Sequence, residues 1–117
     1  MKGRVAITFD EGIHEAGNLK QQGNDKFKAG EYEDATQYYA RAIQTVQMAP
    51  MSNLNEEQKN SLRHILITSF SNRAQACLQM DPPRYEDALR ACNLALQIDS
   101  SNKVGSKSKI LFRYASM

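Results

Sequence analysis

The chain has 117 residues and a formal net charge of +2, and 41% of its residues are hydrophobic and 24% charged. This composition indicates one globular domain with one core and excludes a disordered chain. A membrane-spanning helix is excluded as well, because no apolar run approaches the roughly 18–20 residues that a bilayer requires. The small net charge argues against a general nucleic-acid binder, so we expect a charged partner to be recognised by a few well-placed side chains.

Residues 1–15 precede the first strong helical pattern. The apolar stretch 5–9 alternates only weakly, is too short for a secretory signal and is followed directly by Asp10 and Glu11. We expect residues 1–15 to be an N-terminal tail or the remnant of a preceding segment. The absence of a signal favours a cytoplasmic protein, with a nuclear location also open.

A four-residue sequence, Tyr-Glu-Asp-Ala, occurs twice, at residues 32–35 and 85–88. Each copy follows a turn signal, which is Ala-Gly-Glu at residues 29–31 and Asp-Pro-Pro at residues 81–83. After each copy, apolar residues recur with the i, i+3, i+4, i+7 period of an amphipathic helix, and another helical pattern precedes each turn. These patterns predict an all-α fold with helices at about 12–29, 32–48, 54–80 and 84–98, and a fifth helix from about 104.

The segment 49–53, Ala-Pro-Met-Ser-Asn, separates the second predicted helix from the third. Asn53 and Glu56 have the three-residue spacing of a capping box, in which each side chain bonds the backbone N–H of the other residue. We therefore expect Asn53 to cap the third helix.

Small residues take equivalent places in the two predicted helix pairs: Gly23 and Ala74 in the first helices, and Ala35 and Ala88 in the second. Small side chains at these places allow two antiparallel helices to approach closely.

Cys77 and Cys92 fit neither a disulfide framework nor a metal-ligand spacing. Both lie at inward helical positions, where we expect them to pack in the core.

These residues resemble tetratricopeptide repeats, a family in which each 34-residue unit pairs two helices. The first unit matches the family pattern at Leu19, Gly23, Gly30, Tyr32, Ala35, Tyr39 and Ala42, and the second at Phe70, Ala74, Tyr85, Ala88 and Ala95. The resemblance implies a domain at residues 16–117 with full repeats at about 16–49 and 65–102, and a partial third repeat or capping helix at about 104–117. The two copies begin 53 residues apart, at 32 and 85, so the chain departs from the family's regular spacing.

Five polar residues occur at matching places on the first helix of each unit. Lys20 and Asn24 are four residues apart and share one helix face, as do Lys109 and Arg113 in the third unit, while Asn72 lies on the equivalent helix of the second unit. Stacked helix pairs place these helices along one concave surface. Three cations and two amides on that surface suit a ligand with two adjacent carboxylates, such as a C-terminal aspartate.

The five residues resemble the dicarboxylate clamp of chaperone-binding tetratricopeptide domains. In that family, Lys-x-x-x-Asn, then Asn, then Lys-x-x-x-Arg hold the C-terminal Glu-Glu-Val-Asp of heat-shock protein 90 and 70 chaperones. The resemblance implies that Lys20, Asn24, Asn72, Lys109 and Arg113 hold such a peptide. The link to the third unit is longer than in the family, so Lys103 or Lys107 could replace Lys109.

Three further residues are candidates for contact with the peptide. Phe27 follows the clamp residues on the first helix and could form the floor of a pocket for the peptide valine or belong to the core. Arg73 and Gln75 lie close to Asn72 on the same predicted helix and could reach the peptide or be solvated.

We interpret the chain as a non-enzymatic co-chaperone adaptor that binds the acidic tail of heat-shock protein 90 or 70. His14 and His64 stand alone, with no second catalytic group at motif spacing, and no phosphate-binding loop or metal-ligand set is present. We expect no cofactor, metal, nucleic acid, membrane insertion or small-molecule substrate. The alternatives are a tetratricopeptide scaffold for another protein, or the docking module of a larger enzyme such as a peptidyl-prolyl isomerase.

Overall fold

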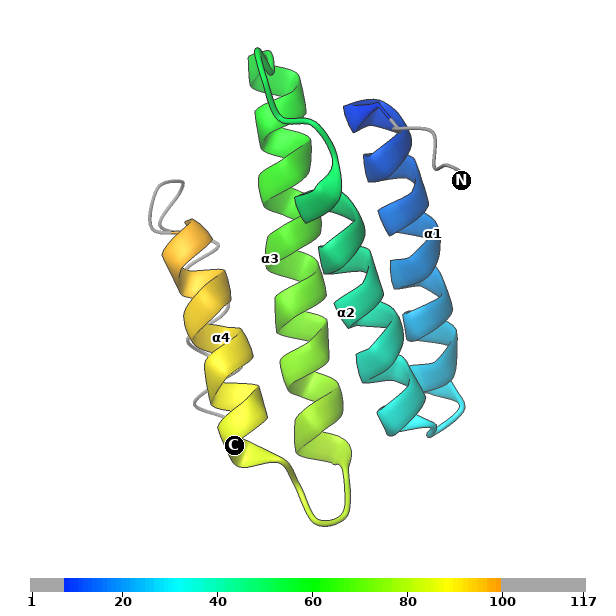
Figure 1. Cartoon of the computed structure of the whole chain (residues 1–117). Helices are drawn as coiled ribbons and strands as arrows, with labels where there is room; N and C mark the ends of the chain where they lie inside the picture. Colours follow the sequence, from blue (N-terminus) through cyan, green and yellow to red (C-terminus); the bar gives the residue numbers. More distant parts are fainter. Residues whose placement is uncertain (1–7, 100–117) are drawn as a thin grey trace.

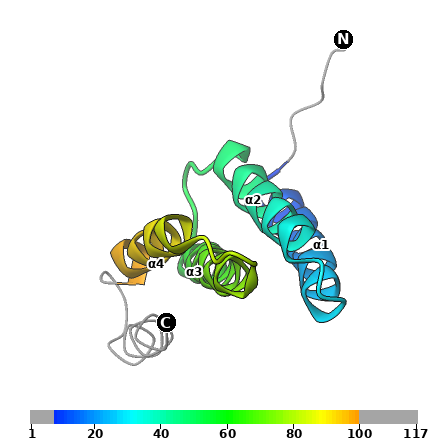
Figure 2. The ribbon, with the colours of Figure 1, turned by 90° about the horizontal axis from the view of Figure 1, so that it is seen from below.

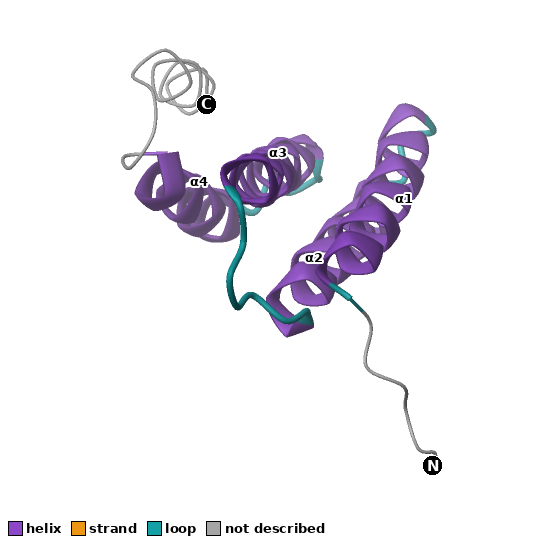
Figure 3. Ribbon diagram, turned by 90° about the horizontal axis from the view of Figure 1, so that it is seen from above, coloured by secondary structure: helices purple, strands orange, loops and turns teal. Residues whose placement is uncertain are grey.

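A computed structural model describes residues 8–99, which form four α-helices and no strand. The helices are α1 (Phe9–Lys28), α2 (Tyr32–Met48), α3 (Glu56–Gln79) and α4 (Tyr85–Asp99). They lie next to one another in chain order, and each runs opposite to the one before it (Figure 1). Seen along the helix axes, α1 and α2 form one pair and α3 and α4 another (Figure 2, Figure 3). The all-α prediction is confirmed, and the arrangement is consistent with two tetratricopeptide helix pairs.

The first helix begins earlier than its sequence pattern indicated. Thr8 is its N-cap, and Thr8 and Glu11 form a capping box in which each side chain accepts from the other residue's backbone N–H. Phe9 is only 6% exposed, and the Gln58 amide of α3 donates to Asp10 at 3.2 Å. The boundary predicted at residue 15 was therefore wrong for residues 9–15, which belong to α1. The expected fifth helix and third repeat, at about 104–117, lie outside the described residues.

The turn between α1 and α2 ends the first helix on a glycine. Gly30 has φ +79°, a left-handed conformation that a residue with a Cβ adopts at a cost. The Gly30 and Glu31 N–H groups donate to the carbonyls of Phe27 and Lys26 at 3.0 and 2.9 Å. These two bonds form a Schellman motif, which satisfies carbonyls at the helix end and reverses the chain.

The cap of α3 differs from the prediction. Asn55, not Asn53, accepts from the Gln58 N–H at 2.7 Å, and the Gln58 side chain accepts from the Asn55 N–H at 3.0 Å. Asn53 has φ +58°, whereas a capping residue has the extended conformation that Asn55 shows. The prediction of an Asn53–Glu56 box was wrong because Asn53 turns the chain three residues before the helix begins at Glu56.

The core consists of three clusters that join the helices in sequence. One lies between α1, α2 and α3 around Ala16 and Ile65, and one joins α3 and α4 around Phe70. Cys77 and Cys92 are both buried in the second cluster, which confirms their predicted packing role. The third cluster packs Ala35 and Tyr39 of α2 against Ala76 of α3. Within residues 8–99, no helix is both long and apolar enough to cross a membrane.

Candidate functional site

Polar side chains of α1 and α3 meet on the surface where the two helices face each other. The Lys20 ammonium of α1 donates to the Thr68 hydroxyl of α3 at 3.0 Å. One helical turn further along both helices, the Asn72 amide donates to the Asn24 Oδ1 at 3.3 Å. The structure therefore brings Lys20, Asn24 and Asn72 together, and the four-residue spacing within each helix aligns the two contacts.

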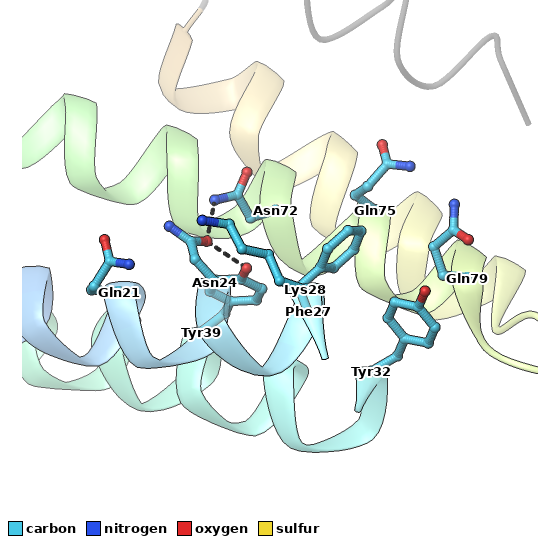
Figure 4. Close-up of a pocket in the computed structure, with 9 residues that line it drawn as sticks. All are labelled: Gln21, Asn24, Phe27, Lys28, Tyr32, Tyr39, Asn72, Gln75 and Gln79. Atoms are coloured by element: carbon cyan, nitrogen blue, oxygen red, sulfur yellow. Dashed lines mark hydrogen bonds between the residues drawn. The ribbon is translucent and has the colours of Figure 1, made fainter. Parts of the chain in front are cut away.

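A third contact determines the orientation of the Asn24 amide. The Tyr39 hydroxyl of α2 donates to the same Asn24 Oδ1 at 2.6 Å, so this oxygen accepts two hydrogen bonds (Figure 4). Because the amide oxygen is held by Tyr39 and Asn72, the Asn24 NH2 group remains as a donor for a ligand. The two hydrogen bonds thus fix the orientation of the Asn24 amide, so that its NH2 group and not its oxygen faces a ligand.

Tyr39 reaches Asn24 because the neighbouring residue on α1 has no side chain. A Cβ added at Gly23 would lie 2.7 Å from Tyr39 Cε1 and 2.9 Å from Cδ1, closer than nonbonded carbons approach. The Tyr39 side chain is only 1% exposed, and burial raises its pKa to about 12. The phenol thus remains a protonated donor at neutral pH.

Lys20 is a half-buried cation without an acidic neighbour. Burial lowers its pKa from the ordinary lysine value, because the charged form loses part of its hydration. Its observed partner, Thr68, is a neutral hydroxyl, and no ion pair involves Lys20 within the part of the chain that the structure describes. A bound carboxylate would restore the lost electrostatic stabilisation.

A pocket of about 620 Å³ continues from the asparagine pair toward the α1–α2 turn. Amides, aromatic rings and one lysine line it: Gln21, Asn24, Phe27, Lys28, Tyr32, Tyr39, Asn72, Gln75 and Gln79. Phe27 and Tyr32 pack edge to face, with ring centroids 5.1 Å apart, on one side of the pocket. No aspartate or glutamate is among the lining residues, so the pocket combines donors, apolar surface and one positive charge.

A second hollow, of about 690 Å³, lies where the α1–α2 and α3–α4 turns meet. Its charged residues are Glu31, Glu33, Asp34, Asp81 and Arg84. Arg84 already forms an ion pair with Glu33 at 2.7 Å, which joins the two helix pairs. The excess of carboxylates makes this hollow unsuitable for an acidic ligand and leaves the surface between α1 and α3 as the candidate site.

The predicted site residues fall into three groups. Lys20, Asn24 and Asn72 are adjacent, and Phe27 and Gln75 line the pocket beside them. Arg73 does not line the pocket, and its Nε has no hydrogen-bond partner within residues 8–99. Lys109 and Arg113, and the alternatives Lys103 and Lys107, lie outside the described residues.

Several pocket residues were missed by the sequence-based prediction: Gln21, Lys28, Tyr32, Tyr39 and Gln79. Lys28 had a signal, because it follows Asn24 by four residues and continues the row that begins at Lys20. Tyr39 matched a core position, and its helical spacing gave no indication that its hydroxyl would reach Asn24.

No family model matches this chain, but the known proteins similar to it include the following two. The DnaJ homolog subfamily C member 7 homolog of Schizosaccharomyces pombe is 32% identical over 103 residues, 88% of this chain. Sperm-associated antigen 1 of Rattus norvegicus is 30% identical over 98 residues, 84% of this chain. The chain spans 18% of the length of the first protein and 9% of the second. The chain is therefore a distant relative of one part of each of these larger proteins.

Proposed function

We propose that the chain is a protein-binding adaptor of the tetratricopeptide type that docks the acidic C-terminal tail of heat-shock protein 90 or 70 chaperones. The carrying observation is the set formed by Lys20, Asn24 and Asn72, in which a half-buried cation lies beside two hydrogen-bonded amides. The similarity to a DnaJ homolog supports a chaperone-associated partner.

A C-terminal aspartate would fit this set through both of its carboxylates. Lys20 supplies charge, and the Asn24 NH2 group, directed by Tyr39, supplies a donor that does not repel the lysine. Hydrogen bonds to an ionised group contribute about 1.5–3 kcal/mol each. In the proposal, Lys109 and Arg113 complete the clamp from the chain beyond residue 99. The summed free energy of the hydrogen bonds to the carboxylates, less the cost of ordering the peptide, corresponds to an affinity on the order of micromolar.

The proposal is tested by titration calorimetry with the peptide Met-Glu-Glu-Val-Asp as a free acid and as a C-terminal amide. The free acid should bind in the micromolar range, and amidation should weaken binding at least about tenfold because one of the two carboxylate charges is removed. Raising the salt concentration to about 0.5 M should also weaken binding, since an open groove is screened. Equal affinities for acid and amide would contradict the clamp and favour a scaffold that binds its partner by apolar contacts.

A further inference from the structure

Lys28 is the one cation among the residues that line the pocket beside the asparagine pair. It follows Asn24 by one helical turn on α1, and its stem runs back along the pocket in the direction of Asn24 and Asn72 (Figure 4). Its ammonium group is thus directed toward the asparagine pair.

The charge of Lys28 is not balanced by a neighbouring acid. Lys26, two residues earlier, pairs with Glu31 at 3.1 Å, and Lys59 pairs with Glu56 at 3.6 Å, but Lys28 makes no ion pair within residues 8–99. The pocket contains no carboxylate either. An acidic group of a ligand would therefore be the first negative charge to enter the pocket.

The opposite wall of the pocket carries neutral polar groups. Gln75 and Gln79 are four residues apart on α3, and neither side chain makes a hydrogen bond to another residue in the described range 8–99. Glutamine amides can donate to a peptide carbonyl and accept from a peptide N–H, so this wall suits an extended main chain. Phe27 and Tyr32 provide apolar surface at its end.

The helix geometry places Lys28 relative to the end of a bound peptide. With a rise of 1.5 Å per residue, Lys28 lies about 6 Å beyond Asn24 and about 12 Å beyond Lys20 along α1. An extended peptide advances about 3.3 Å per residue. If the terminal carboxylates lie between Lys20 and Asn24, about 9 Å from Lys28, then Lys28 faces a residue two or three positions before the last.

We propose that Lys28 is a specificity-determining residue that pairs with an acidic side chain two or three positions before the C-terminal residue, while Gln75 and Gln79 hold the peptide main chain. This proposal rests on the proposed function, because it takes the peptide terminus to lie at Lys20, Asn24 and Asn72. The proposal requires the ligand to carry, besides a terminal aspartate, a second acidic group at a defined distance from its C-terminus.

The test uses the full chain, two peptides and two variants in titration calorimetry. The peptides are Met-Glu-Glu-Val-Asp and Met-Gln-Gln-Val-Asp, both as free acids. Wild-type protein should bind the glutamine peptide about three- to fivefold more weakly, the range expected for a partly exposed ion pair. Lys28→Ala should bind the glutamate peptide more weakly by a similar factor and should discriminate between the two peptides by less than about twofold.

Lys26→Ala is the matched control, because it removes the same charge from α1 at a residue outside the pocket. It should discriminate between the peptides as wild type does, and circular dichroism should show both variants folded. If Lys28→Ala discriminates as strongly as wild type, the proposal for Lys28 is overturned. That result leaves the proposed function intact when the amidated peptide still binds weakly, whereas equal binding of free acid and amide by wild type overturns both.

Discussion

Gly23→Ala tests whether the Tyr39 ring is held against α1 as the structure shows. The new Cβ would lie 2.7 Å from Tyr39 Cε1, and the ring cannot withdraw freely because it is 1% exposed and packs with Ala35 and Ala76. Overpacking of a core costs about 1–3 kcal/mol. Loss of the Tyr39–Asn24 hydrogen bond adds about 1 kcal/mol, and alanine's better helix propensity offsets at most about 1 kcal/mol.

The net expectation for Gly23→Ala is a free energy of unfolding lower by about 1–3 kcal/mol. Gly17→Ala is the matched control on the same helix, because a Cβ there has no atom within 4 Å. It should raise stability by about 0.5–1 kcal/mol through helix propensity alone. Urea unfolding followed by circular dichroism measures both, and for a domain of this size each kcal/mol corresponds to roughly 4–8 °C in Tm. If Gly23→Ala proves as stable as Gly17→Ala, the close approach of Tyr39 to α1 is wrong.

Three further predictions concern the hydroxyl of Tyr39, the cap of α3 and the pH dependence of binding. Tyr39→Phe removes the donor that orients Asn24, so the free-acid peptide should bind at least about threefold more weakly, and in an Asn24→Ala background the same change should have no further effect; additive losses in calorimetry would contradict the orienting role. Asn55→Ala should lower the free energy of unfolding by about 0.5–2 kcal/mol in a urea titration, whereas Asn53→Gly, which removes no cap and keeps the left-handed conformation accessible, should cost less; a larger loss for Asn53→Gly would contradict Asn55 as the cap. Burial lowers the pKa of Lys20, so this residue loses its proton at a lower pH than an exposed lysine. As the pH is raised, the affinity for the free-acid peptide should therefore begin to fall before pH 10.5 is reached. An affinity that stays constant up to pH 10.5 would contradict a charged Lys20 at the site.

The helices were predictable because their determinants are local. The apolar period, the repeated Tyr-Glu-Asp-Ala and the turn residues each act within one or two helical turns, and α2 has the bounds expected for it. The start of α1 was predicted too late because Phe9 was taken as the end of a weakly alternating stretch, residues 5–9. In the structure Phe9 is buried, and Ile13 packs against a cluster that joins α1, α2 and α3.

The cap of α3 shows a limit of local patterns. Asn53–Glu56 and Asn55–Gln58 have the same spacing, and each satisfies the rule for a capping box. Only the backbone distinguishes them, since Asn53 takes the left-handed conformation and Asn55 the extended one. That choice is set by how the connection from α2 reaches α3.

Of the candidate site, the sequence pattern predicted that Lys20, Asn24 and Asn72 would lie along one surface, but it predicted neither their hydrogen bonds nor several of the residues that line the pocket. Helical spacing placed Lys20 and Asn24 on one face, and the repeat pattern placed Asn72 opposite them. The hydrogen bond from Tyr39 to Asn24 depends on the approach of α2 to α1 at Gly23, a tertiary feature that periodicity does not encode. The same holds for Thr68, which contacts Lys20 only because the fold brings these parts of α1 and α3 together.

The central claim is that Lys20 holds the terminal carboxylate of an acidic peptide, and a double-mutant cycle tests it most directly. The free-acid and amidated forms of Met-Glu-Glu-Val-Asp are titrated into wild type, Lys20→Ala and, as a charge-matched control, Lys59→Ala, whose lysine pairs with Glu56. The account predicts that amidation weakens binding at least about tenfold for wild type and Lys59→Ala, but by less than about threefold for Lys20→Ala, because the charge it removes has then lost its partner. An amidation penalty that is as large in Lys20→Ala as in wild type would contradict the claim.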